Sequence, residues 1–288
     1  MAAPNMNDSP SARKARIARS WIFSNSRNLR ALSTVAAMPK LADIVRHLEA
    51  LLDHARIGDY PGAHNGLQFE NSGAISRVAC AVDSCEAVLR EAASVPGTLL
   101  LVHHGMLWCG AQPFTGALRR KVQIAIEGDL TVFSSHLPLD LHPTLGNNAL
   151  LAKALDLKKT RPAFMAKGQM VGIIGELSTT RAALAKKLGA AVNGRVHIAP
   201  GGPDKIKRIG LVTGGAGREV AAAAALDCDA FITGEGPHDS YTLAEELGVN
   251  LFYGGHYATE TFGVRALAEY VAKKYRVPSH FIDHPTGL

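Results

Sequence analysis

Cysteine, aromatic residues and long apolar runs are all scarce in this chain. Its four cysteines form no CxxC pair and are too few for a disulfide scaffold, so they fit a reducing compartment. The most apolar stretches, such as Thr98–Val102, are far shorter than the roughly 18 residues of a membrane-spanning helix, which excludes a membrane partner. Aromatic residues make up 6% of the 288 residues, whereas 47% are hydrophobic, too many for a wholly disordered chain. The length suits one large or two ordinary domains.

Acidic residues are almost missing from residues 1–38. This segment holds six lysines and arginines but Asp8 as its single acid, so it carries most of the net charge of +6. Residues 39–288 are therefore nearly neutral. A neutral body with few aromatic residues does not favour nucleic acid as a partner.

The segment 1–38 also lacks an apolar run, which excludes a secretory signal. Its serine- and arginine-rich composition is compatible with an organelle presequence. We predict instead a basic, disordered tail, or an extension upstream of a working start at Met38, because chain ends are commonly unordered. The expected location is the cytoplasm, with organelle import as the alternative.

Short apolar runs alternate with helix-like segments through the rest of the chain. Each run ends in a polar residue or a glycine, a pattern typical of α/β architecture with largely parallel sheets. The predicted strands are 78–82, 99–102, 130–135, 170–177, 209–212, 231–233 and 250–253. A helix is expected over 39–55 from the helical spacing of its apolar residues.

A charged, proline-containing stretch at Lys158–Gly168 indicates a domain boundary. We predict a first α/β domain over 39–160 plus about 250–288, and a second over about 161–249. The expected fold is therefore α/β, with two α/β domains whose sheets are mixed and largely parallel.

Polar residues gather where the predicted strands end. His103 and His104 close one strand before Gly105, and Asp140 follows another in a proline-containing loop. His256 and Glu260 are spaced so that they share one face of a helix. In α/β sheets the reactive groups collect beyond the carboxyl ends of the strands, so these five side chains are expected to converge.

Three imidazoles and two carboxylates are a ligand set for first-row divalent ions, here zinc, iron or manganese. Five ligands exceed one tetrahedral site, so we predict two metal ions per subunit. Each piece alone has a plainer reading: a packed histidine pair, a surface ion pair at His256 and Glu260, a turn residue at Asp140. Together they favour metal, either at a catalytic site or at a purely structural one.

These segments resemble the Nif-three-like family, also described as GTP cyclohydrolase type 2-like. The matching stretches are Asn65-Gly66-Leu67-Gln68, Leu101–Trp108, Ser135–Asp140, Gly146-Asn147-Asn148, Thr233-Gly234-Glu235 with His238, and Gly255–Glu260. The resemblance runs from about Met38 to Tyr275. It departs at Ala63-His64, where the family commonly has an aromatic residue followed by an acid.

The resemblance implies two α/β domains, a two-metal site in the cleft between them and a homohexamer. Its metal ligands would be the same five residues, and His136, Glu235 and His238 would lie near the site with supporting, substrate-binding or catalytic roles. The implied activity is metal-dependent hydrolysis of a nucleotide-like small molecule, by attack at C8 of a guanine ring. The alternative is a metal-binding hexameric assembly or interaction protein without catalysis.

Two further features receive plainer interpretations. The loop Thr213–Gly217 is predicted to be an ordinary strand-to-helix turn rather than a phosphate cradle, because the full dinucleotide-binding pattern is missing. Asp83 ends a strand and could touch the site, but it is predicted instead to cap the helix that follows it. The remaining histidines are given no functional role, and most of them are predicted to be exposed in helices or loops: His47, His54, His64, His142, His197, His280 and His284.

Overall fold

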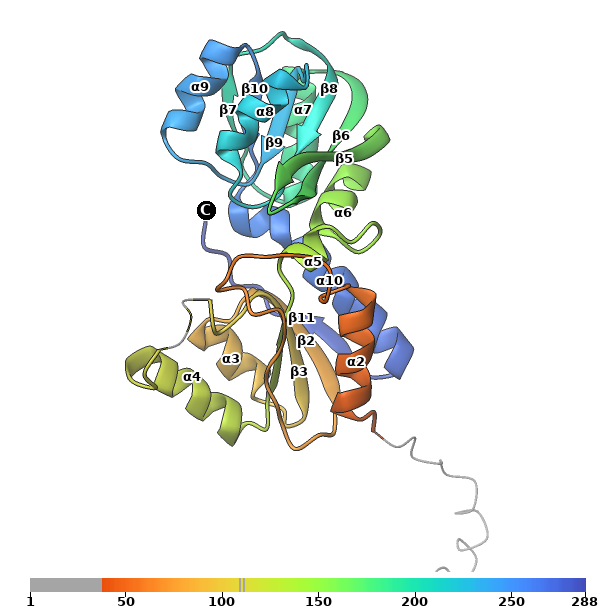
Figure 1. Cartoon of the computed structure of the whole chain (residues 1–288), viewed down its shortest axis with the longest axis vertical. Coiled ribbons are helices and arrows are strands. Elements are labelled where there is room, and N and C mark those ends of the chain that lie inside the picture. Colours follow the sequence, from red (N-terminus) through yellow and green to blue (C-terminus); the bar gives the residue numbers. More distant parts are fainter. Residues whose placement is uncertain (1–37, 109, 111) are drawn as a thin grey trace, which may run out of the picture. The chain divides into compact units, whose positions relative to one another are not determined.

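The computed structural model describes residues 38–288 except 109 and 111 (Figure 1). Within these residues the strands form two sheets, ordered β1-β4-β3-β2-β11 and β5-β6-β8-β9-β10-β7. The first sheet contains β1 (Gly66–Phe69), β2 (Arg77–Asp83), β3 (Thr98–His104), β4 (Thr131–Ser134) and β11 (Ser279–Phe281). The second contains β5 (Lys158–Ala166), β6 (Gln169–Thr180), β7 (His197–Pro200), β8 (Lys205–Leu211), β9 (Ala230–Thr233) and β10 (Asn250–Tyr253).

The helices connect and cover these strands. They are α2 (Leu41–Leu51), α3 (Glu86–Ala92), α4 (Gly116–Glu127), α5 (Leu137–Asp140), α6 (Asn147–Ala154), α7 (Arg181–Val192), the 3-10 helix η2 (Gly217–Glu219), α8 (Val220–Ala225), α9 (Asp239–Leu247) and α10 (His256–Tyr275). Strands β4, β3, β2 and β11 run parallel, as do β8, β9 and β10. The edge strands β1, β5 and β7 and the inner strand β6 pair antiparallel with their neighbours. The predicted α/β class with mixed, largely parallel sheets is confirmed.

Several details differ from the sequence-based expectation. The charged stretch at Lys158–Gly168 is largely strand: Lys158–Ala166 forms β5, an edge strand on which exposed polar side chains are favourable. The strand Asn250–Tyr253 pairs with β9 and β7 in the second sheet. The chain meets the first sheet again only after this strand, where α10 packs on β2 and β3 and β11 pairs with β2.

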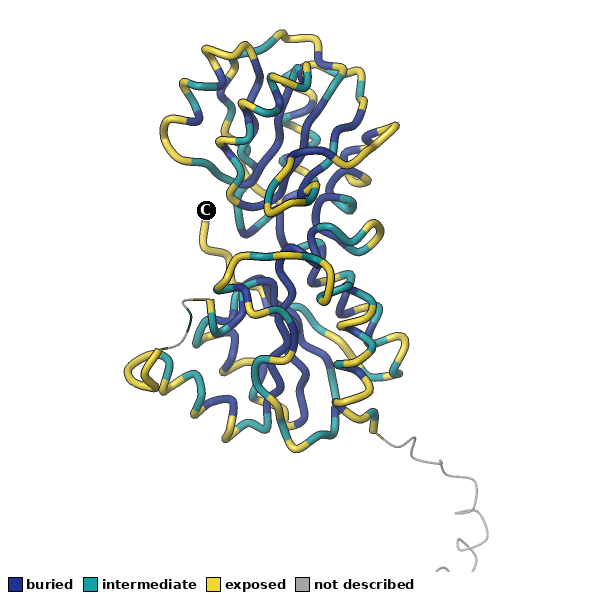
Figure 2. Tube along the Cα trace, viewed as in Figure 1, coloured by how far each residue is buried: buried dark blue, intermediate teal, exposed yellow. Residues whose placement is uncertain are grey.

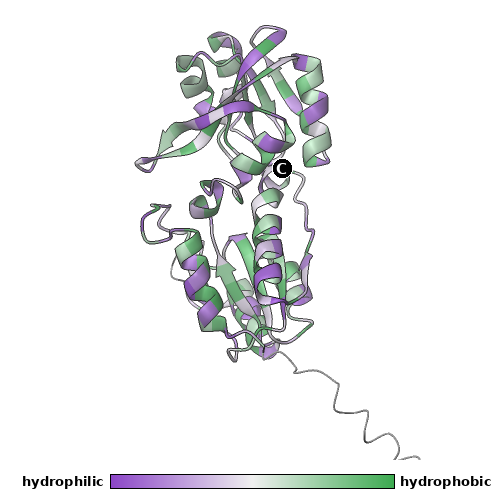
Figure 3. Ribbon diagram, turned by 90° about the vertical axis from the view of Figure 1, so that its right-hand side faces the viewer, coloured by the Kyte–Doolittle hydropathy of each residue, from purple (hydrophilic) through white to green (hydrophobic). Residues whose placement is uncertain are grey.

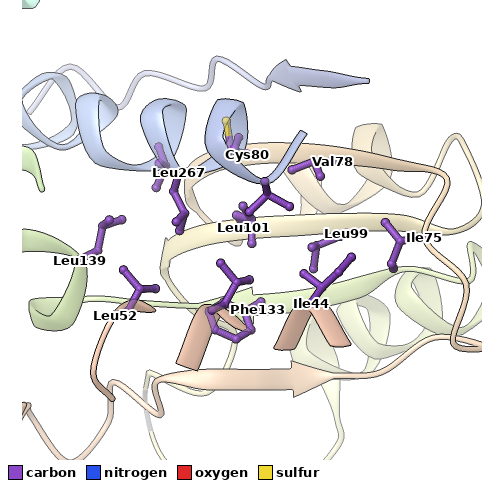
Figure 4. Close-up of a cluster of buried hydrophobic side chains, with 14 of the residues drawn as sticks. Ile44, Leu52, Ile75, Val78, Cys80, Leu99, Leu101, Phe133, Leu139 and Leu267 are labelled. Carbon is purple, nitrogen blue, oxygen red and sulfur yellow. The ribbon is translucent and has the colours of Figure 1, made fainter. Parts of the chain in front are cut away.

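Apolar clusters lie on both faces of both sheets. On one face of the first sheet, Leu99, Leu101 and Phe133 gather with Ile44 of α2 and Leu267 of α10 (Figure 4). The alternate strand residues form a second cluster with α3 and α4. Such two-sided burial explains why these strands read as continuous apolar runs. Figure 2 shows that the strands are largely buried. Figure 3 shows apolar residues concentrated on these strands, whereas the helices carry both apolar and polar residues.

The helix α10 is the main link between the first sheet and the segments around it. It begins after Gly255, whose φ of 92° is a conformation that favours glycine, and it ends at the left-handed Arg276. Its buried face packs against β2, β3 and β11 and against α6. Its first turn therefore starts at the edge where the strands of the first sheet end.

Among the described residues, no helix has the length and apolarity needed to cross a membrane. Cys80 and Cys228 are buried free thiols, and Cys85 is a half-buried one. The predicted basic extension and its alternative as a presequence lie outside the described residues.

Candidate functional site

The carboxyl end of β3 supplies two adjacent histidines. His103 is fully buried, and His104 is partly exposed at the last position of the strand. Parallel pairing of β2 with β3 sets Asp83 directly beside His104. The imidazole rings of His103 and His104 are 4.9 Å apart, so the strand end lets both approach one place.

The neighbouring strand β4 leads into the second group. His136 follows β4, and Asp140 ends the short helix α5 rather than lying in the loop expected for it. Pro138 sits in the first turn of α5, where its missing N–H costs nothing, which explains why a proline-containing segment is helical. The side-chain amide of Asn147 donates to Asp140 Oδ1 over 2.8 Å and holds this carboxylate.

The first turn of α10 supplies the third group. His256 and Glu260 stand one turn apart on the same helix face, as the spacing predicts, and their Nε2 and Oε2 atoms are 3.2 Å apart. Gly214, in the loop after β8, passes directly over Glu260. Its φ of +72°, and the overlap that a Cβ would make with Glu260 Oε1, require glycine at this position.

The three predicted histidine ligands meet at Glu260, and Asp140 joins the group through His103. His103 Nε2 lies 3.5 Å from Glu260 Oε1 and 3.4 Å from Asp140 Oδ2. His104 Nε2 lies 3.5 Å from Glu260 Oε2, the oxygen that also faces His256. Residues far apart in the sequence are thus brought together in three dimensions, as expected from their places at strand and helix ends.

Each histidine is held through its Nδ1 atom. His103 Nδ1 donates to the carbonyl of Ser135 over 3.0 Å. The other three pairs each join Nδ1 to a carboxylate oxygen at 2.8 Å: His104 with Asp83, His136 with Asp59, and His256 with Glu235. With Nδ1 engaged in this way, Nε2 of each neutral ring is left free to coordinate an ion or to exchange a proton, and the first of these is typical of metal-binding histidines.

The donor set fits a metal ion. Two ligand atoms bound to one tetrahedral ion at about 2.1 Å lie about 3.4 Å apart, and the contacts among these residues span 3.2–3.5 Å. His103 Nε2 and Glu260 Oε2 are buried without a hydrogen-bond partner among the described residues. Buried polar atoms in this state need a partner, which a cation at the centre of the group would provide.

The charges of the group are strongly coupled. Burial by itself lowers the pKa of His103, but the negative charges of Asp140 and Glu260 outweigh it and hold this pKa well above its ordinary value. Burial likewise tends to raise the pKa of Glu260, yet the positive charge of His103 holds it well below its usual range. The two buried carboxylates therefore require positive charge beside them, from a proton on His103 or from a cation.

The group opens into a hollow of about 320 Å³. Its walls include His104, His136, Asp140, His256 and Glu260, together with Tyr60, Trp108, Asn148, Val171, Thr213, Gly215 and Glu219. The Trp108 ring stands edge-on to His136, with centroids 4.8 Å apart, and Tyr60 lies 5.9 Å from the same histidine. Water and a small molecule can reach the imidazoles of His104, His136 and His256 through this opening.

The three further candidates take different places. His136 lies within 4.9 Å of His103, centroid to centroid, and lines the hollow. Glu235 contacts the site through His256 and has 43% of its side chain exposed. His238 is exposed at the start of α9 and lines a separate hollow of about 800 Å³ together with Glu235.

Of the acids that hold the rings, sequence reasoning placed Glu235 near the site, favoured another role for Asp83 and missed Asp59. Asp83 lies in β2 and bonds His104, whereas the N-cap of α3 is Cys85, so the predicted capping role is wrong. Asp59 bonds His136 Nδ1, the side chain of Asn65 and the amide of Leu137. Asp83 could have been found from its place at a strand end in line with His104. Asp59 lies in a loop, and no local sequence pattern predicts where its side chain points.

The structure also tests the interpretations given to the loop Thr213–Gly217 and to His54. Among the amides of the loop after β8, Thr213 N donates to Asn148, Gly214 N to Thr259 and Gly217 N to Glu235. The interpretation as a turn fits, because these amides are engaged within the protein. His54 is half-buried and bonds Ser135 Oγ over 3.0 Å, so it is an exception to the exposure expected for most of the remaining histidines.

Comparison with known proteins gives consistent matches. The family described as Duf34/NIF3 (NGG1p interacting factor 3) matches residues 39–286. A Deinococcus radiodurans protein named GTP cyclohydrolase 1 type 2 homolog is 37% identical over 239 residues, covering 82% of this chain and 91% of that protein. A Halobacterium salinarum protein of the same name is 40% identical over 243 residues, covering 82% and 96%.

Solved structures agree with these matches. The crystal structure of TTHA1606 from Thermus thermophilus has a TM-score of 0.78 at 34% identity and covers 87% of this chain and 100% of that one. Protein ybgI, described as of unknown function, has a TM-score of 0.79 at 31% identity with the same coverage. Both structures share the fold, and 31–34% of their sequence is identical to that of this chain.

Proposed function

The chain belongs to the Duf34/NIF3 family, and from that premise we propose that it is a dinuclear metal protein that hydrolyses a nucleotide-like small molecule. The family resemblance deduced from the motifs is confirmed. Two groups among the described residues could hold a metal ion: His103, His104 and His136, and His104, His256 and Glu260. Two bound ions and hydrolysis go beyond these findings and form the proposal.

The observation that carries the proposal is the way Glu260 divides its contacts. Its Oε1 faces His103, which also meets Asp140, and its Oε2 faces His104 and His256. This supports two ligand sets that share one carboxylate. We assign one divalent ion (zinc, iron or manganese) to each set, because imidazole and carboxylate donors suit all three.

Divalent ions held by these residues would supply Lewis-acid activation of a water molecule and of the substrate. The chain itself supplies a group for proton transfer. His136 lines the hollow, and its Nδ1 is held by Asp59, so its Nε2 is the atom that can take up or release a proton. The contacts of Asp59 with Asn65 and the Leu137 amide fix the carboxylate and thereby the ring.

The walls of the hollow support a planar substrate. Tyr60 and Trp108 flank His136, and aromatic rings stack on nucleobases and similar heterocycles. Similar proteins carry the name GTP cyclohydrolase 1 type 2 homolog. We therefore propose a guanine nucleotide or a related compound as substrate, with hydrolytic opening of its ring. Glu235 acts by positioning His256, and we give His238 no direct part.

The test combines metal analysis with turnover. Protein purified without chelators should contain two ions per chain, and incubation with GTP should remove the purine absorbance as the ring opens. Glu260→Gln should lower turnover by more than about 100-fold while the circular dichroism spectrum stays that of the folded protein. Glu176→Gln removes a surface acid paired with Lys159 and should leave turnover unchanged.

Two results would overturn the proposal. Protein without bound metal after chelator-free purification would exclude the metal centre. Protein with metal but no turnover on nucleotides, in which Glu260→Gln mainly lowers the melting temperature, would identify the non-catalytic metal-binding assembly instead.

We also propose a homohexamer, which the family resemblance implies. Light scattering on eluted protein should then give six times the 30.5 kDa chain mass. A monomer at micromolar concentration would contradict it.

A further inference from the structure

The turn between β5 and β6 has a residue that its backbone disfavours. Ala166 and Gln169 are the last paired residues, so Lys167 and Gly168 form a two-residue turn. Their φ angles are 48° and 78°, both in the left-handed region. Turns of this kind favour asparagine followed by glycine, because a lysine side chain is strained there. Strained residues are often retained for function, which draws attention to Lys167.

This turn is fastened beside the hollow of the candidate site. The Gln169 side chain donates to the carbonyl of Gly58 over 2.6 Å, which fixes the turn against the loop carrying Tyr60. The Lys167 ammonium lies 4.3 Å from the centroid of the Tyr60 ring. Tyr60 and Ala166 both line the hollow, so the hairpin places a positive charge at its rim.

The charges of the residues that line the hollow explain why a cation at Lys167 matters. The acids of the wall are Asp140, Glu219 and Glu260, and none of the described lining residues is a lysine or an arginine. An anionic group entering along the wall would be repelled by the acids that are not neutralised, Glu219 in particular. Lys167 provides a cation for this anionic group, beside the aromatic ring of Tyr60 on which a planar ring can stack.

We propose that Lys167 is an anion subsite of this hollow, binding the phosphate of a nucleoside phosphate whose base lies against Tyr60 and Trp108. This inference rests on the proposed function, since it names the part of the substrate that sits at the rim. The lysine ammonium donates hydrogen bonds to phosphate oxygens, and no covalent step is involved.

The experiment measures binding rather than turnover. Isothermal titration of the chain, carrying the metal with which it is purified, would compare GTP with guanosine. Lys167→Asn removes the charge and gives the turn the residue that it prefers. We expect it to weaken GTP binding by about tenfold or more, while guanosine binding changes less than about twofold. Lys167→Arg should retain most of the GTP affinity.

Lys159→Gln is the matched control. Lys159 lies on β5 in the same hairpin but pairs with Glu176, with 2.7 Å between Nζ and Oε2, so its loss should not affect either ligand. Added salt should weaken GTP binding to the unmodified chain more than to Lys167→Asn, because one charge pair is missing in the variant.

The possible results separate this inference from the proposed function. GTP binding that depends on Lys167 without any turnover would support the subsite and remove the proposed hydrolysis. Equal GTP affinity in Lys167→Asn and the unmodified chain would overturn the subsite. So would an equal loss of GTP and guanosine binding, since Lys167 would then serve only to order the Tyr60 ring.

Discussion

The strand β3 and the helix α10 hold their imidazoles in different ways. His103 on β3 is fully buried, and its Nδ1 is fixed by a backbone carbonyl, that of Ser135. His256 on α10 is half-buried, and its Nδ1 is fixed by Glu235, whose side chain is 43% exposed. His103 (the β3 side) is thus held by the backbone of the sheet, whereas His256 (the α10 side), like His104 with Asp83, depends on an ion pair that water, protons and salt can reach. The α10 side is the one that small changes should disturb.

The largest effect on metal affinity is expected from Gly214→Ala, which places a new methyl group against Glu260 at the start of α10. The new Cβ would overlap Glu260 Oε1, so the Glu260 side chain must move, while its 3.4 Å distance to His256 Nε2 is an ordinary van der Waals contact. Metal affinity, measured by competition with a chromophoric chelator, should fall on the order of 100-fold.

Gly248→Ala is the control for backbone strain. Gly248 has a φ of +71°, close to that of Gly214, but an added Cβ would meet nothing within 4 Å. It should lose about 1 kcal/mol of stability and keep its metal affinity. Similar metal affinities in the two variants would show that Glu260 does not need this close contact.

A smaller effect is expected from Glu235→Gln, compared with Ser135→Ala. Loss of the Glu235 charge leaves the His256 ring less firmly held, and metal affinity should fall about tenfold. Ser135→Ala should stay within about twofold, because the carbonyl and not the hydroxyl holds His103. An equal loss in both variants would remove the distinction between the two sides.

The pH dependence of the metal-free protein should report on His256 and also on His103, because the pKa of each is raised. Burial lowers the pKa of His256, but the charges of Glu260 and Glu235 outweigh it and raise the pKa to about 9. A raised pKa in the folded state stabilises the fold fully below the ordinary value of about 6.5, and this stability is lost as the pH rises to about 9.

The melting temperature of chelator-treated protein should therefore fall by a few degrees across this range. Metal-loaded protein should lack this decline, since the bound ring carries no extra proton. A parallel decline in both forms would assign it to other groups.

The smallest effect is expected from His54→Phe, beneath the β3 side. The His54 ring stacks on Phe133, and burial lowers its pKa to about 4. Because this pKa is depressed, the folded protein loses stability as the pH falls from about 6.5 towards 4.

A phenylalanine keeps the stacked ring and cannot titrate. The variant should lose about 1 kcal/mol at neutral pH with the hydrogen bond to Ser135, and its acid-side decline should be shallower in thermal melts. An unchanged acid-side slope would mean that other groups cause the decline.

Much of the fold could be predicted because buried parallel strands are continuous apolar runs. The strand Asn250–Tyr253 was predicted with the bounds that it has, and its neighbours within a few residues. The strand β5 was missed because an edge strand tolerates charges and a proline, which then resemble a linker. The short β11 pairs with β2 from far along the chain, and no local pattern reveals such a pairing.

The convergence of the five candidate ligands could also be predicted. Three of them lie at or just after the ends of neighbouring parallel strands, and the other two are one helical turn apart. The residues that orient them could not. Asp59 reaches His136 from a loop, and Gln169 fastens the hairpin to Gly58 through a backbone carbonyl. Such contacts depend on how separate segments pack, which residue spacing does not encode.

The pairing of Asp83 with His104 has a consequence for how the protein matures. Side chains alternate along a strand, so a slip of one residue between β2 and β3 would set Val82 beside His104 and turn Asp83 to the wrong face. The imidazole would then lose the carboxylate that aims it. Chains with misaligned strands would be poor at capturing metal, and uptake of the ions would favour those whose sheet has assembled correctly.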